Sequence, residues 1–208
     1  MERIFPNDMQ HCLDALKECW QGQPDLSFMA LIQSLEAHGM QWDSPPAEIA
    51  ALAYHLAGEH PASVPLQTPD VFEVRCMDPV ATVTIQQGIV VYRQRHNDTW
   101  LSPTVLQPTD AQCTIGERLR LENVYHGEVV SIRKLYAHPA SIYLGVFDDD
   151  SLMEMGPQQT IAYRILRREI TRSILPAIPR PLELEIGQPL EGFGTACLTH
   201  VLLLGDAR

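Results

Sequence analysis

Two arginines lie on the two strands of the clearest hairpin that the sequence predicts. The strands are expected over residues 118–125 and 128–136, and they carry Arg120 and Arg133. Side chains on the same face of adjacent strands converge, and guanidinium groups bind carboxylates through charge-assisted hydrogen bonds. The pair therefore predicts a pocket that holds a small carboxylated molecule.

A second group of arginines recurs at helical spacing later in the chain. A helix is expected to begin at Gly156-Pro157 and to end before Pro176. Its inward face is expected to be formed by Ile161, Ile165, Leu166 and Ile170. Its arginine stripe consists of Arg164, Arg167, Arg168 and Arg172. Such a stripe suits either a polyanionic small molecule or a solvated face that pairs with nearby acids.

Other chemistries find little support in the residue patterns. His55 and His60 are five residues apart, which is not the i, i+4 spacing that places two metal ligands on one helix face. The acidic triplet 148–150 lacks the glycine and later glutamate of a calcium loop, so a solvated turn is expected. The sequence contains no nucleophile elbow, phosphate-binding glycine loop or dinucleotide fingerprint. We therefore expect no metal, no cofactor and no catalytic residue.

Composition indicates a globular protein of the cytoplasm. The 208 residues are 45% hydrophobic and 20% charged, which suits a compact domain plus a smaller one. No apolar run approaches the roughly 20 residues that span a bilayer, and the N-terminus does not resemble a signal peptide. The five cysteines are scattered without a C-x-x-C pair, so reduced and mostly buried thiols are expected.

The net charge of −11 is concentrated at the N-terminal end. Residues 1–70 hold ten acidic and two basic side chains, whereas residues 71–208 hold 16 and 13. An acidic surface repels nucleic acid phosphates and anionic membranes. Neither is therefore expected as a partner.

Three short helices are expected within residues 1–58. The first begins at Asn7 or Asp8. Its apolar residues recur at helical spacing and are Met9, Leu13, Leu16 and Trp20. The second helix begins at Asp25 or Ser27, and its apolar face comprises Phe28, Leu31, Ile32 and Leu35. The third follows Ser44-Pro45 and continues to Gly58. A proline-rich linker is expected over residues 59–70.

From residue 71 to residue 208 the pattern predicts mainly antiparallel strands. Early strands are expected at Val71–Met77, Val80–Gln86 and Ile89–Gln94, before the arginine hairpin, which turns at His126-Gly127. Ile142–Phe147 is either another strand or the start of a helical segment, and late strands are expected at Leu182–Ile186 and Thr195–Leu204. The predicted fold class is α+β, with an N-terminal three-helix module followed by a sheet domain with one long helix.

The helical part resembles the small helical YihD-like bacterial family. The residues that carry this resemblance are the run from Trp20 to Leu26, Leu31 to Leu35, Gly39, and Tyr54-His55-Leu56. That family has no assigned function, so the resemblance implies architecture and no chemistry. From the pattern alone, Trp20, Tyr54 and Leu56 are expected to be core residues.

Residues 80–204 resemble the chorismate lyase fold, which ligand-sensing domains of some bacterial regulators share. The resemblance rests on the hairpin arginines, the Gly156-led helix and the Thr171-Arg172 step. It implies that Arg120 holds a substrate carboxylate, that Arg133 lies near a second family arginine and that Arg172 belongs to the site. His200 stands where the family carries a catalytic glutamate, and an imidazole does not replace a carboxylate in that role.

These observations leave two hypotheses for function. The first is a non-catalytic binder of a small carboxylated metabolite, with Arg120, Arg133, His200 and Arg172 as ligand-binding residues. The second is a protein–protein interaction or assembly module, as a homodimer or with another protein. It rests on the acidic helical part and on the missing catalytic motifs. Both hypotheses are non-catalytic, and enzymatic activity is less favoured than either.

Overall fold

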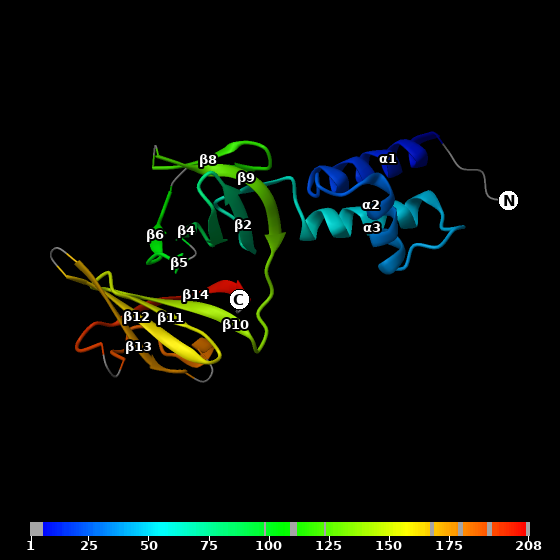
Figure 1. Ribbon diagram of the computed structural model, residues 1–208. Coiled ribbons are helices and arrows are strands. Elements are labelled where there is room, and N and C mark those ends of the chain that lie inside the picture. The colour runs from blue at the N-terminus through cyan, green and yellow to red at the C-terminus, as the bar shows by residue number, and fades with distance from the viewer. Residues whose placement is uncertain are drawn as a thin grey trace.

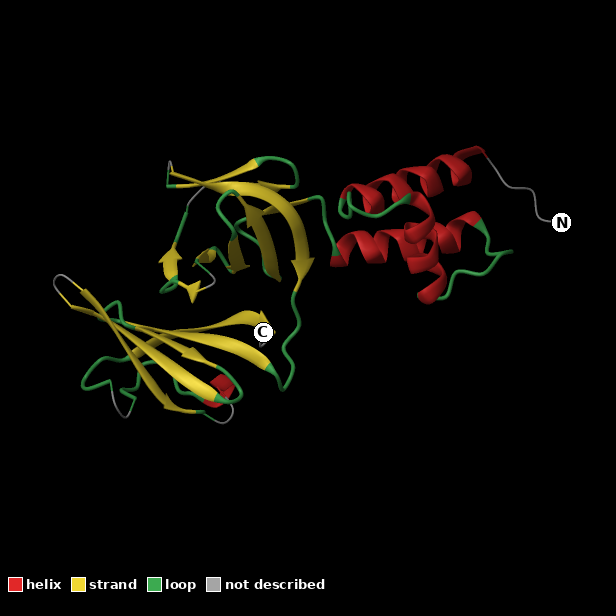
Figure 2. Ribbon diagram, viewed as in Figure 1, coloured by secondary structure: helices red, strands yellow, loops and turns green. Residues whose placement is uncertain are grey.

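Three α-helices and three antiparallel sheets make up the described part of the protein, whose structure is a computed structural model (Figures 1 and 2). It describes residues 6–97, 99–108, 112–122, 124–166, 169–178, 181–190 and 193–206. The α+β class and the antiparallel pairing are as predicted. Within the described residues, no helix is long and apolar enough to cross a membrane.

The helices are α1 (Pro6–Gln21), α2 (Phe28–Ala37) and α3 (Pro46–Glu59). Ser27 caps α2, since its Oγ accepts a hydrogen bond from the backbone N–H of Ala30 at 3.2 Å. Pro45 and Pro46 start α3, where a missing backbone N–H costs nothing. All three predicted helices are therefore present, and in Figure 1 they lie together to one side of the sheets.

Small side chains form the contact between α1 and α3. The buried residues of the two helices are Cys12, Ala15 and Cys19 of α1 and Ala50, Ala53, Leu56 and Ala57 of α3, so that all but Leu56 are small. Small residues let two helix backbones approach closely, because little side-chain volume separates them. Gly22 follows α1 at the closest point, where a Cβ atom would lie 1.6 Å from the carbonyl oxygen of His60.

A seven-stranded sheet forms the middle of the molecule. Its strands are β2 (Val71–Met77), β3 (Ala81–Gln86), β4 (Ile89–His96), β5 (Thr99–Trp100), β6 (Thr104–Leu106), β8 (Arg118–Leu121) and β9 (Val124–Lys134). The order is β5-β4-β3-β2-β9-β8, with β6 also paired to β4. One face is apolar and is covered by a small sheet of β1 (Ser63–Pro65) and β7 (Gln112–Thr114).

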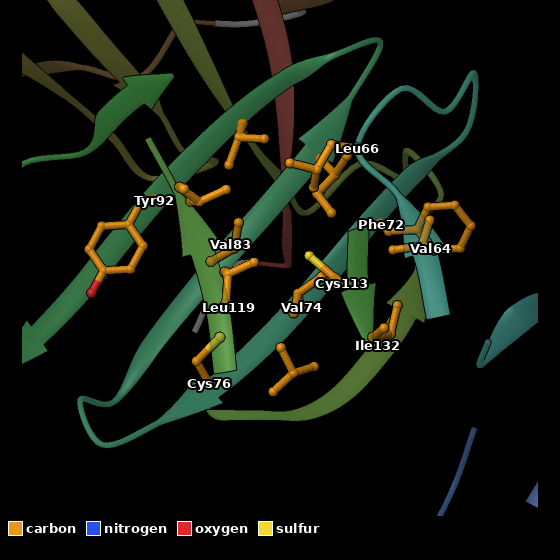
Figure 3. Packing of buried hydrophobic residues seen from close by; sticks show 14 of the residues in the cluster. Val64, Leu66, Phe72, Val74, Cys76, Val83, Tyr92, Cys113, Leu119 and Ile132 are labelled. Carbon is orange, nitrogen blue, oxygen red and sulfur yellow. The ribbon is translucent and has the colours of Figure 1, made fainter. Parts of the chain in front are cut away.

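Figure 3 shows this core, in which Val64, Leu66 and Cys113 from the covering segments meet Val74 and Ile132 of the large sheet. Val64 and Leu66 lie in the stretch for which a linker was predicted. The prolines of that stretch therefore accompany packed backbone as well as connecting backbone.

A five-stranded sheet forms the second β layer. Its strands are β10 (Ser141–Phe147), β11 (Leu152–Met155), β12 (Gln159–Leu166), β13 (Glu169–Pro176) and β14 (Leu198–Asp206). They lie in the order β13-β12-β11-β10-β14. Leu144, Leu152 and Leu202 of this sheet pack against Ile89 and Val91 of β4, which joins the two sheets.

The face that the seven-stranded sheet turns toward β14 is largely polar, and its buried polar residues are Glu73, Thr82, Thr84 and Arg93. Strand pairing places these residues on one face: Glu73, Arg75, Thr82, Thr84, Gln86, Arg93 and Arg133. Several of them hold β14 directly. Gln86 Oε1 accepts a hydrogen bond from the backbone N–H of Leu203 at 3.0 Å, and Arg93 Nη2 donates to the carbonyl oxygen of Leu204 at 2.8 Å.

The long helix predicted after Gly156 is wrong. The segment forms the antiparallel pair β12 and β13, in which Ile161 is buried whereas Ile170 is exposed. Consecutive residues 160–163 of β12 are all buried, because both faces of the strand are covered. A strand buried on both faces shows no alternation, so its apolar residues imitated a helical pattern. Arg167 and Arg168 of the predicted stripe lie outside the described residues.

Two smaller expectations also need correction. The arginine hairpin turns near Glu122, earlier than predicted, and β9 continues through His126 and Gly127. No strand forms at 182–186, where a 3-10 helix (Pro181–Glu183) and turns occur. Residues 142–147 are a strand, which resolves that alternative.

Gly22→Ala is expected to destabilise the protein by about 2–3 kcal/mol, because the new methyl group meets backbone that cannot move aside. Urea denaturation measures the effect. Gly58→Ala is the matched control, since a Cβ at Gly58 in α3 meets nothing within 4 Å. That variant gains up to about 1 kcal/mol from helix propensity. Equal stabilities of the two variants would contradict the close helix contact.

Candidate functional site

The four residues predicted to bind a carboxylate do not converge. Arg120 lies on β8 opposite Tyr125 of β9, with its guanidinium carbon 6.0 Å from the centre of the Tyr125 ring. Arg133 is eight residues farther along β9, about 26 Å at 3.3 Å per residue. The hairpin therefore places the two guanidinium groups at opposite ends of one strand.

Arg133 instead connects the two large sheets. Its Nη2 lies 3.4 Å from Oε1 of Glu73 and 3.7 Å from Oδ2 of Asp206, at the end of β14. The same oxygen of Glu73 lies 3.1 Å from Nε of Arg75. Glu73 is only 3% exposed, and a buried carboxylate requires such partners. The arginine thus neutralises the buried carboxylate of Glu73 and the exposed carboxylate of Asp206.

Backbone geometry and a histidine complete this charged cluster. Gly205 of β14 has a φ of +109°, and a Cβ there would lie 3.2 Å from Oε2 of Glu73. Asp206 hydrogen-bonds Nε2 of His138, and this bond together with the Arg133 charge lowers the pKa of the Asp206 carboxyl. The cluster fixes the end of β14 to β2 and β9, so its role in the fold is structural.

His200 and Arg172 lie on other strands. His200 is exposed on β14, where its Nδ1 is 3.1 Å from Oγ1 of Thr199. Arg172 is exposed on β13, opposite Tyr163. Burial raises the pKa of nearby Glu154, and the charges of Arg93 and Arg172 oppose that rise. No contact brings these two residues to Arg120 or Arg133 among the described parts of the chain.

Thiol chemistry is unsupported at two of the buried cysteines. Cys76 and Cys113 lie in the core of the seven-stranded sheet, and burial raises the pKa of each thiol to about 12. The reactive form of cysteine is the thiolate. Both side chains therefore act as small core residues. Within the described residues, no three His, Cys, Asp or Glu side chains are grouped to hold a metal ion.

The most distinctive surface lies on the helical module. The large apolar residues of α1 face outward, because the small residues of α1 occupy the contact with α3. The exposed fractions are 54% for Met9, 58% for Leu13, 40% for Trp20 and 47% for Phe28 at the start of α2. Core positions were predicted for Trp20 and Tyr54, and both are exposed, whereas Leu56 is buried as predicted.

An apolar groove of about 520 Å³ runs along this surface. It is lined by Leu13, Leu16, Lys17, Trp20, Gln21, Pro24 and Phe28. Trp20 Nε1 donates a hydrogen bond to the carbonyl oxygen of Leu26 at 2.7 Å, and its ring lies 5.5 Å from that of Phe28. These contacts hold the indole in place while leaving one side open to a partner.

The helical module is acidic as a whole, although the charged side chain that lines the groove, Lys17, is basic. Residues 6–59 contain eight Asp and Glu residues and one basic residue, Lys17. Apolar patches of this kind on otherwise polar proteins mark interaction sites. The sequence pattern identified the residues of this surface but not its direction. The missed signal was the parallel repeat of Cys12, Ala15 and Cys19, which matches the alanines of α3 in size.

Comparison with known proteins found no match for the chain. No family model matches the chain, and no curated protein or solved structure is significantly similar. The YihD-like and chorismate lyase-like resemblances stay predictions, and the second loses the Gly156-led helix on which it partly rested. Any statement of function therefore rests on the geometry described above.

Replacing Arg133 with Met is expected to destabilise the protein by about 1–3 kcal/mol, because the buried carboxylate of Glu73 loses one of its partners. Urea denaturation is the measurement. Arg120→Met is the control, and it is expected to cost less than about 1 kcal/mol, since Arg120 contacts an exposed ring. A larger loss of unfolding free energy in the Arg120 variant than in the Arg133 variant would contradict the structural role assigned to Arg133.

His60 gives the junction between α3 and β9 a pH dependence. Burial is the main cause that lowers the His60 pKa below 6.5, and the Arg133 charge adds to it. The unfolded chain then binds a proton that the folded protein excludes. Stability is therefore full above pH 6.5 and falls as the pH drops from there through the folded-state pKa. His60→Gln is expected to flatten the dependence of the melting temperature between pH 6.5 and 5, and an unchanged slope would contradict this.

Proposed function

We propose that the protein is a non-catalytic interaction module whose helical part binds an amphipathic, basic helix of a partner protein. The observation that carries the proposal is the outward face of α1, where Leu13, Trp20 and Phe28 line a groove. In α1 the small residues are buried and the large apolar residues face solvent. Those large residues would become buried if a partner packed against them.

The size and shape of the groove suit a helix. Met9, Leu13, Leu16 and Trp20 repeat at intervals of four, three and four residues, a stripe about 16 Å long. A partner helix that presents apolar residues at i, i+4, i+7 and i+11 covers the same length. Trp20 is the expected centre of the binding energy, because aromatic residues in apolar pockets dominate such contacts.

Charge selects among amphipathic helices. The excess of acidic residues on the helical module favours lysines and arginines that flank the apolar side of the partner. Charged rims increase association rates and make them sensitive to salt. The carboxylate-binding hypothesis lacks comparable support, because it requires Arg120 and Arg133 to face one cavity.

Trp20→Ala is expected to weaken binding of a basic amphipathic peptide by about 30-fold, which corresponds to a hot-spot loss of about 2 kcal/mol. The probe is an 18-residue helix of leucine and lysine, titrated calorimetrically into the whole protein. The same helix with glutamate in place of lysine is expected to bind more weakly. Raising the salt concentration is expected to reduce the difference in affinity between the two peptides.

Tyr125→Ala is the control, because Tyr125 is also exposed but lies on β9, outside the helical module. It is expected to bind the peptide as the unchanged protein does. Equal affinity of the two variants would refute the groove as the binding site. Light scattering tests whether a second copy of this chain occupies the groove instead. A dimer that dissociates in the Trp20→Ala variant would identify that second copy as the occupant.

A further inference from the structure

The outer edge of the five-stranded sheet is a long strand with exposed isoleucines. Among the described residues, β13 pairs with β12 and with no second strand. Ile170 and Ile174 are 54% and 66% exposed, and Arg172 lies between them on the same face. Natural sheet edges are commonly protected by charges, bulges or proline, because unpaired backbone groups attract other strands. In β13 such protection is limited to the charges of Glu169 and Arg172 and to a proline at the last position.

This face of β13 extends a layer that is buried elsewhere. Ile174 pairs with Ile161 of β12, and Arg172 pairs with Tyr163. Both β12 residues belong to the apolar cluster that joins the two large sheets. The apolar layer therefore reaches solvent at β13, where the next strand of the sheet would continue it.

We infer that β13 accepts an extended segment of a partner protein as a sixth strand of this sheet. The segment carries an acidic residue opposite Arg172 and apolar residues two positions to each side, opposite Ile170 and Ile174. Backbone hydrogen bonds to the open edge supply affinity, and the alternate side chains supply specificity. Opposite charges placed directly across two strands stabilise the pairing.

A second copy of β13 fits this edge poorly. Antiparallel pairing centred on Arg172 aligns the isoleucines but places the two copies of Arg172 against each other. Pairing centred on Thr171 or Ser173 sets Arg172 against an isoleucine instead. Like charges directly opposite are destabilising, so the geometry favours a different chain with a carboxylate at the centre.

The test uses the capped peptide Thr-Val-Thr-Glu-Thr-Val-Thr and its counterpart with lysine at the centre. The intact protein is expected to bind the glutamate peptide at least about fivefold more tightly, and Arg172→Glu is expected to reverse that preference. Calorimetry measures affinity, and amide chemical shifts place the peptide at β13. N-methylation of the peptide backbone is expected to abolish binding.

Ile174→Thr is the second variant, because it keeps β propensity while removing apolar contact, and it is expected to weaken binding of the glutamate peptide. Trp20→Ala separates this site from the helical groove and is expected to leave the peptide affinity unchanged. Absence of binding, an unreversed preference in folded Arg172→Glu, or shifts confined to other strands would overturn the inference. The inference would also be overturned if the protein bound no peptide but formed a concentration-dependent dimer that the Ile174→Thr variant no longer forms.

Discussion

The close approach of α1 and α3 determines what the helical module presents to solvent. Because Ala53 and Cys19 occupy the contact between the two helices, the large apolar residues of α1 have no place inside it. Gly22 extends the same constraint beyond the end of α1, where no side chain fits beside the carbonyl of His60. The groove around Trp20 is thus a consequence of how the small residues are spaced along α1.

A different constraint governs the two large sheets. They are joined by an apolar cluster on one side and by a charged cluster around Glu73 on the other. Glu73 is held by arginines from β2 and β9, and Gly205 allows β14 to pass close to its carboxylate. Ion pairs to a buried carboxylate contribute modestly to stability but penalise alternative arrangements, because any misplacement leaves the acid without a partner.

Much of the local structure was predictable, while the direction of side chains was not. The three helices and the strands from Val71 to His96 follow from caps, prolines and alternation, which act within a few residues. The β12–β13 pair could not be predicted from the sequence, because burial on both faces of β12 removes the alternation that marks a strand.

The arrangement of the predicted site residues was not predictable for a similar reason. Arg133 was recognised as a residue that binds carboxylates, and it does so, but its acids come from Glu73 and from Asp206 far along the chain. On α1, Leu13 and Trp20 were identified as an apolar stripe, but only the distant alanines of α3 decide that the stripe points outward. Spacing along a chain carries no information about which distant segment will cover it.

The distribution of cysteines gives the protein internal reporters of motion. Cys12 and Cys19 are buried in the helical module, whereas Cys76 and Cys113 are buried beneath the seven-stranded sheet. A thiol reagent reaches such side chains only when the surrounding structure opens. The rates at which the two pairs are alkylated would therefore separate the opening of the helices from that of the β core within one unmodified molecule.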